Sequence, residues 1–226
     1  MNKKYIKISI VLNILIIILT TFASLTMFLG IRYMGDDILL STSKIGMFKF
    51  FTVDSNLFQG IISFIFMIYE IKLLKGSIKE IPKILYILKL IAIVGVTLTF
   101  LTVFGYLGFI VDGGVIVLLK NSNLFFHLIT PLLSIITFTL FEKTNRLSFK
   151  YTFIGTSSTI IYSIFYTTNV FIHIKNGKVD PIYDWYYFVQ GGLHQTFFVL
   201  PIMLAITFII SLLLWYFNRR GYEYRR

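Results

Sequence analysis

The chain has 226 residues, of which 57% are hydrophobic, 18% are aromatic and only 14% are charged. Soluble domains carry about 25% charged residues, so this composition excludes a soluble enzyme and a disordered tail. Because the chain has no cysteine, it also lacks a disulfide framework, a thiolate nucleophile and a Cys-ligated metal centre.

Six apolar segments follow one another along the chain, and each can cross the roughly 30 Å hydrocarbon core of a bilayer as a helix. The first has a basic N-terminal flank but no convincing cleavage site, so we expect an uncleaved span. No linker or internal repeat divides the sequence. We therefore predict an all-α, polytopic integral membrane protein with six transmembrane helices in a single domain, residues 1–226. The spans lie near residues 8–31, 50–71, 86–111, 121–141, 151–174 and 194–218.

The basic residues are divided unevenly between the two sides that these spans define. The formal net charge is +11, and the side with both termini holds 15 of the 21 Lys and Arg residues. By the positive-inside rule, both termini are predicted to be cytoplasmic. The positive charge is then a topology signal that also attracts anionic lipid headgroups. We expect a multi-pass plasma-membrane protein, bacterial in type, with no nucleic-acid partner.

Polar side chains enter the second span on one helical face. Thr52, Asn56 and Gln59 follow the i, i+4, i+7 spacing of a helix, and Ser55 lies on the same side. Interhelical hydrogen bonds alone explain the Ser and Thr positions. Asp54 is a stronger candidate, because an ionisable group in a span is by default functional, although it also fits an interfacial residue near the helix start.

A second polar stripe follows the fourth span. Pro131 cannot donate an amide hydrogen to the carbonyl of His127, so we expect a kink beside this histidine. A further series at helical spacing, Tyr162, Tyr166 and Asn169, fits either cavity lining or packing in span 5. The fourth-span stripe consists of Asn123, His127, Thr130, Ser134 and Thr137.

In this topology spans 2, 4 and 6 all begin at the outer face, so their polar ends share the outer leaflet. At 1.5 Å per residue, Thr52 lies about 3 Å and His127 about 9 Å below the start of its span. The connecting segments 32–49 and 175–193 can cover the mouth of a cavity there. We expect one outer-leaflet cavity surrounded by Thr52, Asp54, Asn56, Asn121, Asn123, His127, His173, Asp184 and His194.

A threonine hydroxyl becomes an effective nucleophile when an imidazole accepts its proton. Thr52 and His127 fit these roles, and Asp54, Asn123 or Asp184 can orient the imidazole. The sequence has no Gly-x-Ser-x-Gly elbow and no phosphate-binding loop. Three histidines with nearby carboxylates are ordinary metal ligands, but none of them share a His-x-x-x-His spacing, so we expect no metal and no cofactor.

Three charged residues lie near the predicted inner ends of the spans. Lys89, Glu70 and Glu142 have side chains long enough to reach water from there. We expect them to do so, and assign them no chemistry. His173 and His194 read as interfacial residues, with His194 also a supporting residue of the cavity.

Two stretches of the sequence resemble a known family. Residues 49–57 read Lys-Phe-Phe-Thr-Val-Asp-Ser-Asn-Leu, and Asn123-x-x-x-His127-x-x-x-Pro131 follows in the fourth span. With the span layout of nearly the whole chain, they resemble the androgen-induced/androgen-dependent family of multispanning membrane proteins and its bacterial relatives. Those relatives carry a Phe-Thr-x-x-Ser-Asn-Leu stretch at the start of span 2. The later Pro181-x-Tyr183-Asp184 also resembles the bacterial branch.

The eukaryotic members hydrolyse fatty acid esters of hydroxy fatty acids with a Thr nucleophile and a His. The resemblance therefore implies these roles for Thr52 and His127. The Asp54-Ser55-Asn56 continuation differs from the eukaryotic pattern, which makes Ser55 an alternative nucleophile. We predict a membrane-embedded threonine hydrolase of lipophilic esters that draws its substrate from the outer leaflet. The alternative is a non-catalytic transporter or lipid-binding protein that uses the same cavity.

Overall fold

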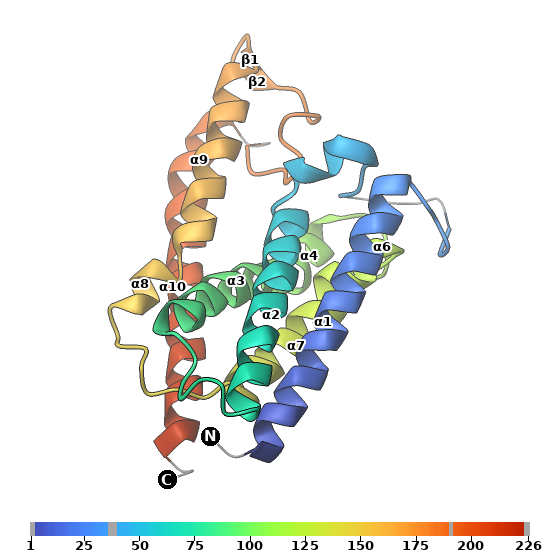
Figure 1. Ribbon diagram of the computed structural model, residues 1–226. Helices are drawn as coiled ribbons and strands as arrows, with labels where there is room; N and C mark the ends of the chain where they lie inside the picture. The colour runs from blue at the N-terminus through green and yellow to red at the C-terminus, as the bar shows by residue number, and fades with distance from the viewer. Residues whose placement is uncertain (1–2, 36–39, 190–191, 224–226) are drawn as a thin grey trace.

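Helix α3 (Lys83–Thr102) is the central element of the computed structural model, and the other long helices surround it (Figure 1). The structure describes residues 3–35, 40–189 and 192–223. The other long helices are α1 (Lys3–Leu29), α2 (Phe51–Leu74), α9 (Ser157–Ile172) and α10 (Thr196–Glu223). The short α-helices are α4 (Gly108–Ile110), α5 (Gly114–Leu118), α6 (Ser122–Leu124), α7 (Thr130–Ile136) and α8 (Tyr151–Ile154).

Tighter and wider helical turns connect or extend these helices. The 3-10 segments are η1 (Lys44–Lys49) and η5 (Leu193–Gln195). The π-helical segments are η2 (Val103–Leu107), η3 (Phe125–Ile129) and η4 (Thr137–Phe141). Strands β1 (Ile174–Lys175) and β2 (Lys178–Val179) pair antiparallel in a small hairpin at the end of the molecule opposite the chain termini (Figure 1).

Among the described residues, five helical segments are long and apolar enough to cross a membrane, which confirms the predicted class of all-α membrane protein. The predicted fifth span, 151–174, is divided by a turn at Gly155 and Thr156 into α8 and α9. Helix α9 has 16 residues, which is about 24 Å of helix and shorter than the bilayer core. The five candidate spans are Lys3–Leu29, Phe51–Leu74, Lys83–Ile110, Ser122–Phe141 and Thr196–Arg220.

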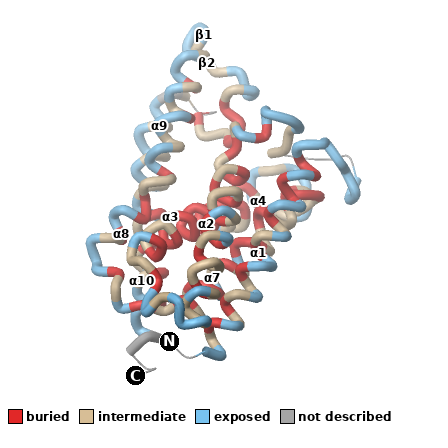
Figure 2. Tube along the Cα trace, in the orientation of Figure 1, coloured by how far each residue is buried: buried red, intermediate tan, exposed pale blue. Residues whose placement is uncertain are grey.

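Large apolar side chains cover the outside of the bundle. On α1, Val11, Ile18 and Leu25 recur every seven residues and are 56%, 56% and 55% exposed. Soluble proteins rarely expose continuous apolar faces of this kind. By contrast, Leu90 and Ile93 of α3 are fully buried, and Figure 2 shows the buried residues gathered around α3. The pattern is that of a helix bundle whose outer faces contact lipid.

The fourth span is interrupted at the predicted place. Pro131 follows η3, the π-helical segment that contains His127. Because Pro131 has no N–H to donate to the carbonyl of His127, the regular α-helical ladder fails there, and the helix takes a wider turn. Such π turns are frequent at functional sites.

Candidate functional site

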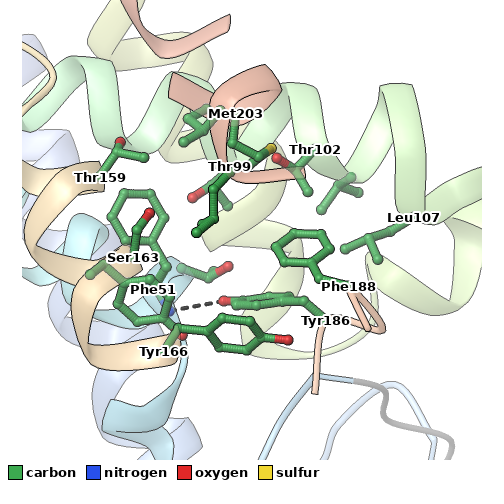
Figure 3. A pocket seen from close by; sticks show the side chains of 15 residues that line it. Phe51, Thr99, Thr102, Leu107, Thr159, Ser163, Tyr166, Tyr186, Phe188 and Met203 are labelled. Carbon is green, nitrogen blue, oxygen red and sulfur yellow. Dashed lines mark hydrogen bonds between the residues drawn. The ribbon is translucent and has the colours of Figure 1, made fainter. Parts of the chain in front are cut away.

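Thr52 lines a pocket between the first turn of α2, helices α3, α9 and α10, and the segment 184–189 (Figure 3). The pocket holds about 590 Å³ of space free of atoms, including space open to the surroundings. Its walls are apolar and aromatic, with a few hydroxyl groups, which suits a lipophilic ligand. The lining residues are Phe51, Thr52, Leu98, Thr99, Thr102, Val103, Leu107, Thr159, Tyr162, Ser163, Tyr166, Tyr186, Phe188, Leu200 and Met203.

Tyr186 places a phenol beside Thr52. Its hydroxyl oxygen accepts a hydrogen bond from the amide of Phe51 at 2.9 Å, and it also makes a hydrogen bond with the Thr52 side chain. Burial raises the pKa of Tyr186 to about 12, although hydrogen bonds from Tyr162, Phe51 and Thr52 oppose that rise. Tyr186 is therefore a neutral hydrogen-bond donor at physiological pH.

His127 is fully buried in η3. Its Nδ1 lies 2.6 Å from the carbonyl oxygen of Leu118. A carbonyl can only accept, so Nδ1 carries the proton of the neutral ring and Nε2 carries the lone pair. Nε2 is buried and has no hydrogen-bond partner among the described residues. The imidazole is thus oriented by a backbone carbonyl, with a free basic nitrogen.

Asn56 connects the turn that carries Thr52 to the turn that carries His127. Its amide nitrogen donates to the carbonyl of Thr52 at 2.8 Å and to the carbonyl of Phe126 at 3.1 Å. Asn56 is fully buried. Of the two predicted catalytic residues, Thr52 lines the pocket and His127 does not, within the described part of the chain.

Ser55, the alternative nucleophile, faces a different space. With Asp54 it lines a second cavity between α2, α3 and α9, with about 1030 Å³ free of atoms including space open to the surroundings. The Ser55 hydroxyl donates to the carbonyl of Thr52 at 3.2 Å and lies 3.4 Å from the hydroxyl of Thr99. The two hydroxyls at this end of α2 therefore open into separate cavities.

Asp184 organises the segment that covers the pocket. Its carboxylate accepts hydrogen bonds from the Tyr166 hydroxyl and from the amides of Phe188 and Val189, the latter two at 2.9 and 3.0 Å. Trp185 donates to the Tyr162 hydroxyl at 3.0 Å. These contacts hold an aromatic segment, residues 184–189, against α9. Among the described residues, the Asp184 carboxylate forms its hydrogen bonds with Tyr166 and with the segment 184–189, and none of them is with His127.

The structure does not gather the nine predicted cavity residues around one pocket. Asn121 instead fixes the segment after α1, since its Oδ1 accepts from the amides of Tyr33 and Met34 at 2.6 and 2.8 Å. His173 stacks on Tyr183 with ring centres 3.6 Å apart. Asn123 is buried on α6, and His194 lies in η5. Only Thr52 of the nine lines the pocket of Figure 3.

Sequence reasoning missed the main contributors to the pocket wall. Tyr186 and Phe188 line the pocket, although neither is among the predicted cavity residues and the sequence predicts only that their segment, 175–193, covers a cavity mouth. The helical spacing of Tyr162 and Tyr166 was the available signal. Both residues line the pocket, whereas Asn169 donates to the carbonyl of Tyr183 at 3.0 Å, so cavity lining holds for the two tyrosines of that series.

No family model matches this chain, and no curated protein or solved structure matches it. The resemblance to the androgen-induced/androgen-dependent family therefore rests on the short stretches around Thr52 and His127 and on the span layout. The function has to be argued from the site.

Proposed function

We propose that the protein hydrolyses lipophilic esters, with Thr52 as the nucleophile and His127 as the general base. The observation that carries this proposal is the Thr52 hydroxyl in the wall of an apolar pocket, beside a neutral phenol. Such a pocket accepts an acyl chain and excludes water from the reacting carbonyl. Asn56 bonds the carbonyls of Thr52 and of Phe126, the residue before His127. The Nε2 of His127 has no hydrogen-bond partner among the described residues and is suited to accept a proton.

The reaction proceeds in two steps. Thr52 attacks the ester carbonyl carbon, its proton passes to His127 directly or through one water, and a tetrahedral oxyanion forms. The Tyr186 hydroxyl donates a hydrogen bond to that oxyanion. The C–O bond to the alcohol then breaks, and the alcohol leaves with the proton from His127. Water, activated by His127, hydrolyses the acyl-threonine and releases the carboxylic acid.

The substrate class follows from the pocket and the resemblance. Leu98 of α3, Leu107 of η2 and Met203 of α10 supply apolar wall, which suits an alkyl chain that comes from the bilayer. The resemblance adds fatty acid esters of hydroxy fatty acids as the first substrates to test. No cofactor is needed for this chemistry.

A sixth membrane crossing and cytoplasmic termini belong to the same proposal. The start of α1 and the end of α10 lie at one end of the bundle (Figure 1), which supports an even number of crossings. Helices α8 and α9 with their turn, Tyr151–Ile172, supply about 33 Å, enough for the remaining crossing. The Lys and Arg bias supports termini in the cytoplasm of a bacterial cell, and a pocket in the outer leaflet of its plasma membrane.

The test is hydrolysis of a long-chain ester of a hydroxy fatty acid by the purified full-length protein in lipid nanodiscs. Thr52→Ala should abolish turnover and Thr52→Ser should retain part of it, because serine keeps a hydroxyl. Thr207→Ala is the matched control, since Thr207 is a fully buried threonine of α10 whose hydroxyl donates to the carbonyl of Met203 at 2.7 Å. If the wild type hydrolyses no ester but binds or moves a lipophilic solute in a Thr52-dependent way, the transporter or lipid-binding alternative replaces the hydrolase.

A further inference from the structure

A fully buried polar cluster lies toward the end of the bundle that holds both termini. We call its six members the Lys89 cluster: Ser9, Asn13, Ser63, Glu70, Lys89 and Glu142, each 0% exposed. They come from α1, α2, α3 and the residue that follows η4. The expectation that Lys89, Glu70 and Glu142 reach water is therefore wrong. Glu70 lies about 27 Å along α2 from Thr52, so this cluster is separate from the ester pocket.

Lys89 is held by three partners inside the bundle. Its Nζ donates to Asn13 Oδ1 at 2.6 Å and to Ser63 Oγ at 3.0 Å, and it pairs with Glu142 Oε1 at 3.0 Å. An ammonium group has three hydrogens to donate, so these contacts use all of them. The lysine charge is fixed in place.

The two carboxyl groups are partnered unequally. Glu142 Oε1 accepts from Lys89, from Asn13 Nδ2 at 2.8 Å and from Ser9 Oγ at 3.4 Å. Glu70 Oε2 accepts from Asn13 Nδ2 at 3.1 Å, and the Glu70 carboxyl group also accepts a hydrogen bond from Ser9. Glu70 Oε1 and Glu142 Oε2 are buried without a hydrogen-bond partner among the described residues. Glu142 is thus the counter-ion of Lys89, and Glu70 has none of its own.

The charge of the cluster does not balance if both carboxyl groups are ionised. The charged groups that act on Glu70 are Glu142, which repels its negative charge, and Lys89. The remaining groups around it, Ser9 and Asn13 of α1, are neutral. Two carboxylates with one ammonium leave one uncompensated negative charge, which is strongly unfavourable away from water. A proton on one carboxyl group removes that charge.

We propose that the Lys89 cluster is a proton-binding site, in which Glu70 and Glu142 share one proton and Lys89 is the fixed counter-charge. The proton resides on Glu70, because Glu142 is the carboxyl group that pairs with Lys89. Its loss leaves a buried negative charge between α1, α2 and α3, which favours entry of water there. Proton binding is therefore coupled to the closed packing of these three helices.

The experiment is infrared spectroscopy of the full-length protein in lipid nanodiscs, which records the C=O stretch of protonated carboxyl groups. Helix α2 carries one carboxyl group besides that of Glu70, the half-buried side chain of Asp54. Asp54 is therefore replaced by Asn in every sample, so that it cannot contribute to the band. Glu70→Gln and Glu142→Gln should each lose the band, because the one remaining carboxylate pairs with Lys89. Lys89→Met should show about twice the wild-type intensity, because charge neutrality then requires two protons. Glu80→Gln is the control, since Glu80 is an exposed partner of Arg146, and should leave the band unchanged.

Two outcomes overturn the proposal. A band that is the same in wild type, Glu70→Gln and Lys89→Met means that the cluster holds no shared proton. A band that appears only when sodium is replaced by a large organic cation means that a sodium ion, rather than a proton, neutralises the cluster. If a glutamine variant does not fold, the comparison of wild type with Lys89→Met decides alone, since equal intensities contradict the shared proton and a doubled intensity supports it.

Discussion

Asn56 of α2 donates a hydrogen bond to the carbonyl oxygen of Phe126 in η3, across a distance of 3.1 Å. The same amide nitrogen donates to the carbonyl of Thr52 at 2.8 Å. One side chain thus fixes the position of the turn before His127 relative to the turn of Thr52. Interhelical hydrogen bonds of this kind contribute about 0.6 kcal/mol each, so the main effect of this bridge is on geometry.

Asn56→Ala should lower kcat by about 10- to 100-fold with little change in KM, because it misplaces the nucleophile relative to the base. Asn218→Ala is the matched control. Asn218 is also a buried asparagine that donates to two carbonyls, of Phe138 at 2.7 Å and Glu142 at 2.9 Å, but it lies at the end with the termini. Equal kcat losses in the two variants would mean that the bridge acts only through stability.

Thr52→Ala and His127→Ala should each reduce ester hydrolysis by about 10⁴-fold or more, and the double variant should be no worse than either. The reason is that both changes remove the same proton-coupled attack. Steady-state kinetics of the three variants, at matched protein yield and thermal stability, measure this. Additive losses would show that the two residues do not work as a pair.

Tyr186→Phe should lower kcat by about 10²- to 10³-fold, the usual effect of losing one oxyanion donor. A phenol donates only while it is protonated. Because burial raises the pKa of Tyr186 to about 12, the ratio of wild-type to Tyr186→Phe activity should stay constant from neutral to mildly alkaline pH. A pH–rate profile of both proteins tests this, and a ratio that falls near pH 10, the ordinary pKa of tyrosine, would contradict the assigned role.

Gly155→Ala should destabilise the fold by about 1 to 3 kcal/mol, as overpacking does. A methyl group at Gly155, in the turn between α8 and α9, would overlap the Ser211 hydroxyl of α10. Thermal unfolding in detergent should show the loss, and Ser211→Gly in the same chain should restore part of it. Gly105→Ala is the control, since no atom lies within 4 Å of the methyl group added there. Gly76→Ala is unsuitable, because Gly76 has a positive φ of 75° that an alanine would strain.

A reporter that is active only in the cytoplasm should be active when it is fused after Arg226. A single cysteine introduced by Lys178→Cys should react with a membrane-impermeant thiol reagent from outside the cell. Lys178 lies in the β hairpin at the end opposite the termini. The chain has no native cysteine, so the labelling has no background. Labelling at Lys178 only after the cells are opened would invert the proposed topology.

The sequence predicted the parts of the fold that depend on local pattern. Apolar runs located five spanning helices, and Pro131 located the interruption beside His127. The pattern could not reveal that the turn at Gly155 divides the fifth segment, nor that Gly155 packs closely against Ser211, because Ser211 belongs to a helix that is distant in the sequence. Nor could it reveal the Leu118 carbonyl as the partner of His127, since every residue has a carbonyl and only the chain path selects one.

The errors concern residues whose role depends on distant partners. Lys89, judged alone, is a lysine near a helix end that can extend to water. Its burial depends on Asn13, Ser63 and Glu142, which belong to three other segments of the chain. The role of Asp184 also depends on the chain path, because its carboxylate accepts hydrogen bonds from Tyr166 of α9 and from the amides of Phe188 and Val189.

The Lys89 cluster constrains the order in which the protein can assemble during synthesis. Asn13 and Ser63 emerge from the ribosome before Lys89, whereas its ion-pair partner Glu142 emerges only after the fourth span. A lone lysine costs about 2.5 to 3.5 kcal/mol at the centre of an inserting helix. Contact between the nascent α1 and α2 therefore lowers the cost of inserting α3, and the later arrival of Glu142 adds an ion-pair partner to the amide and hydroxyl groups that already bind Lys89.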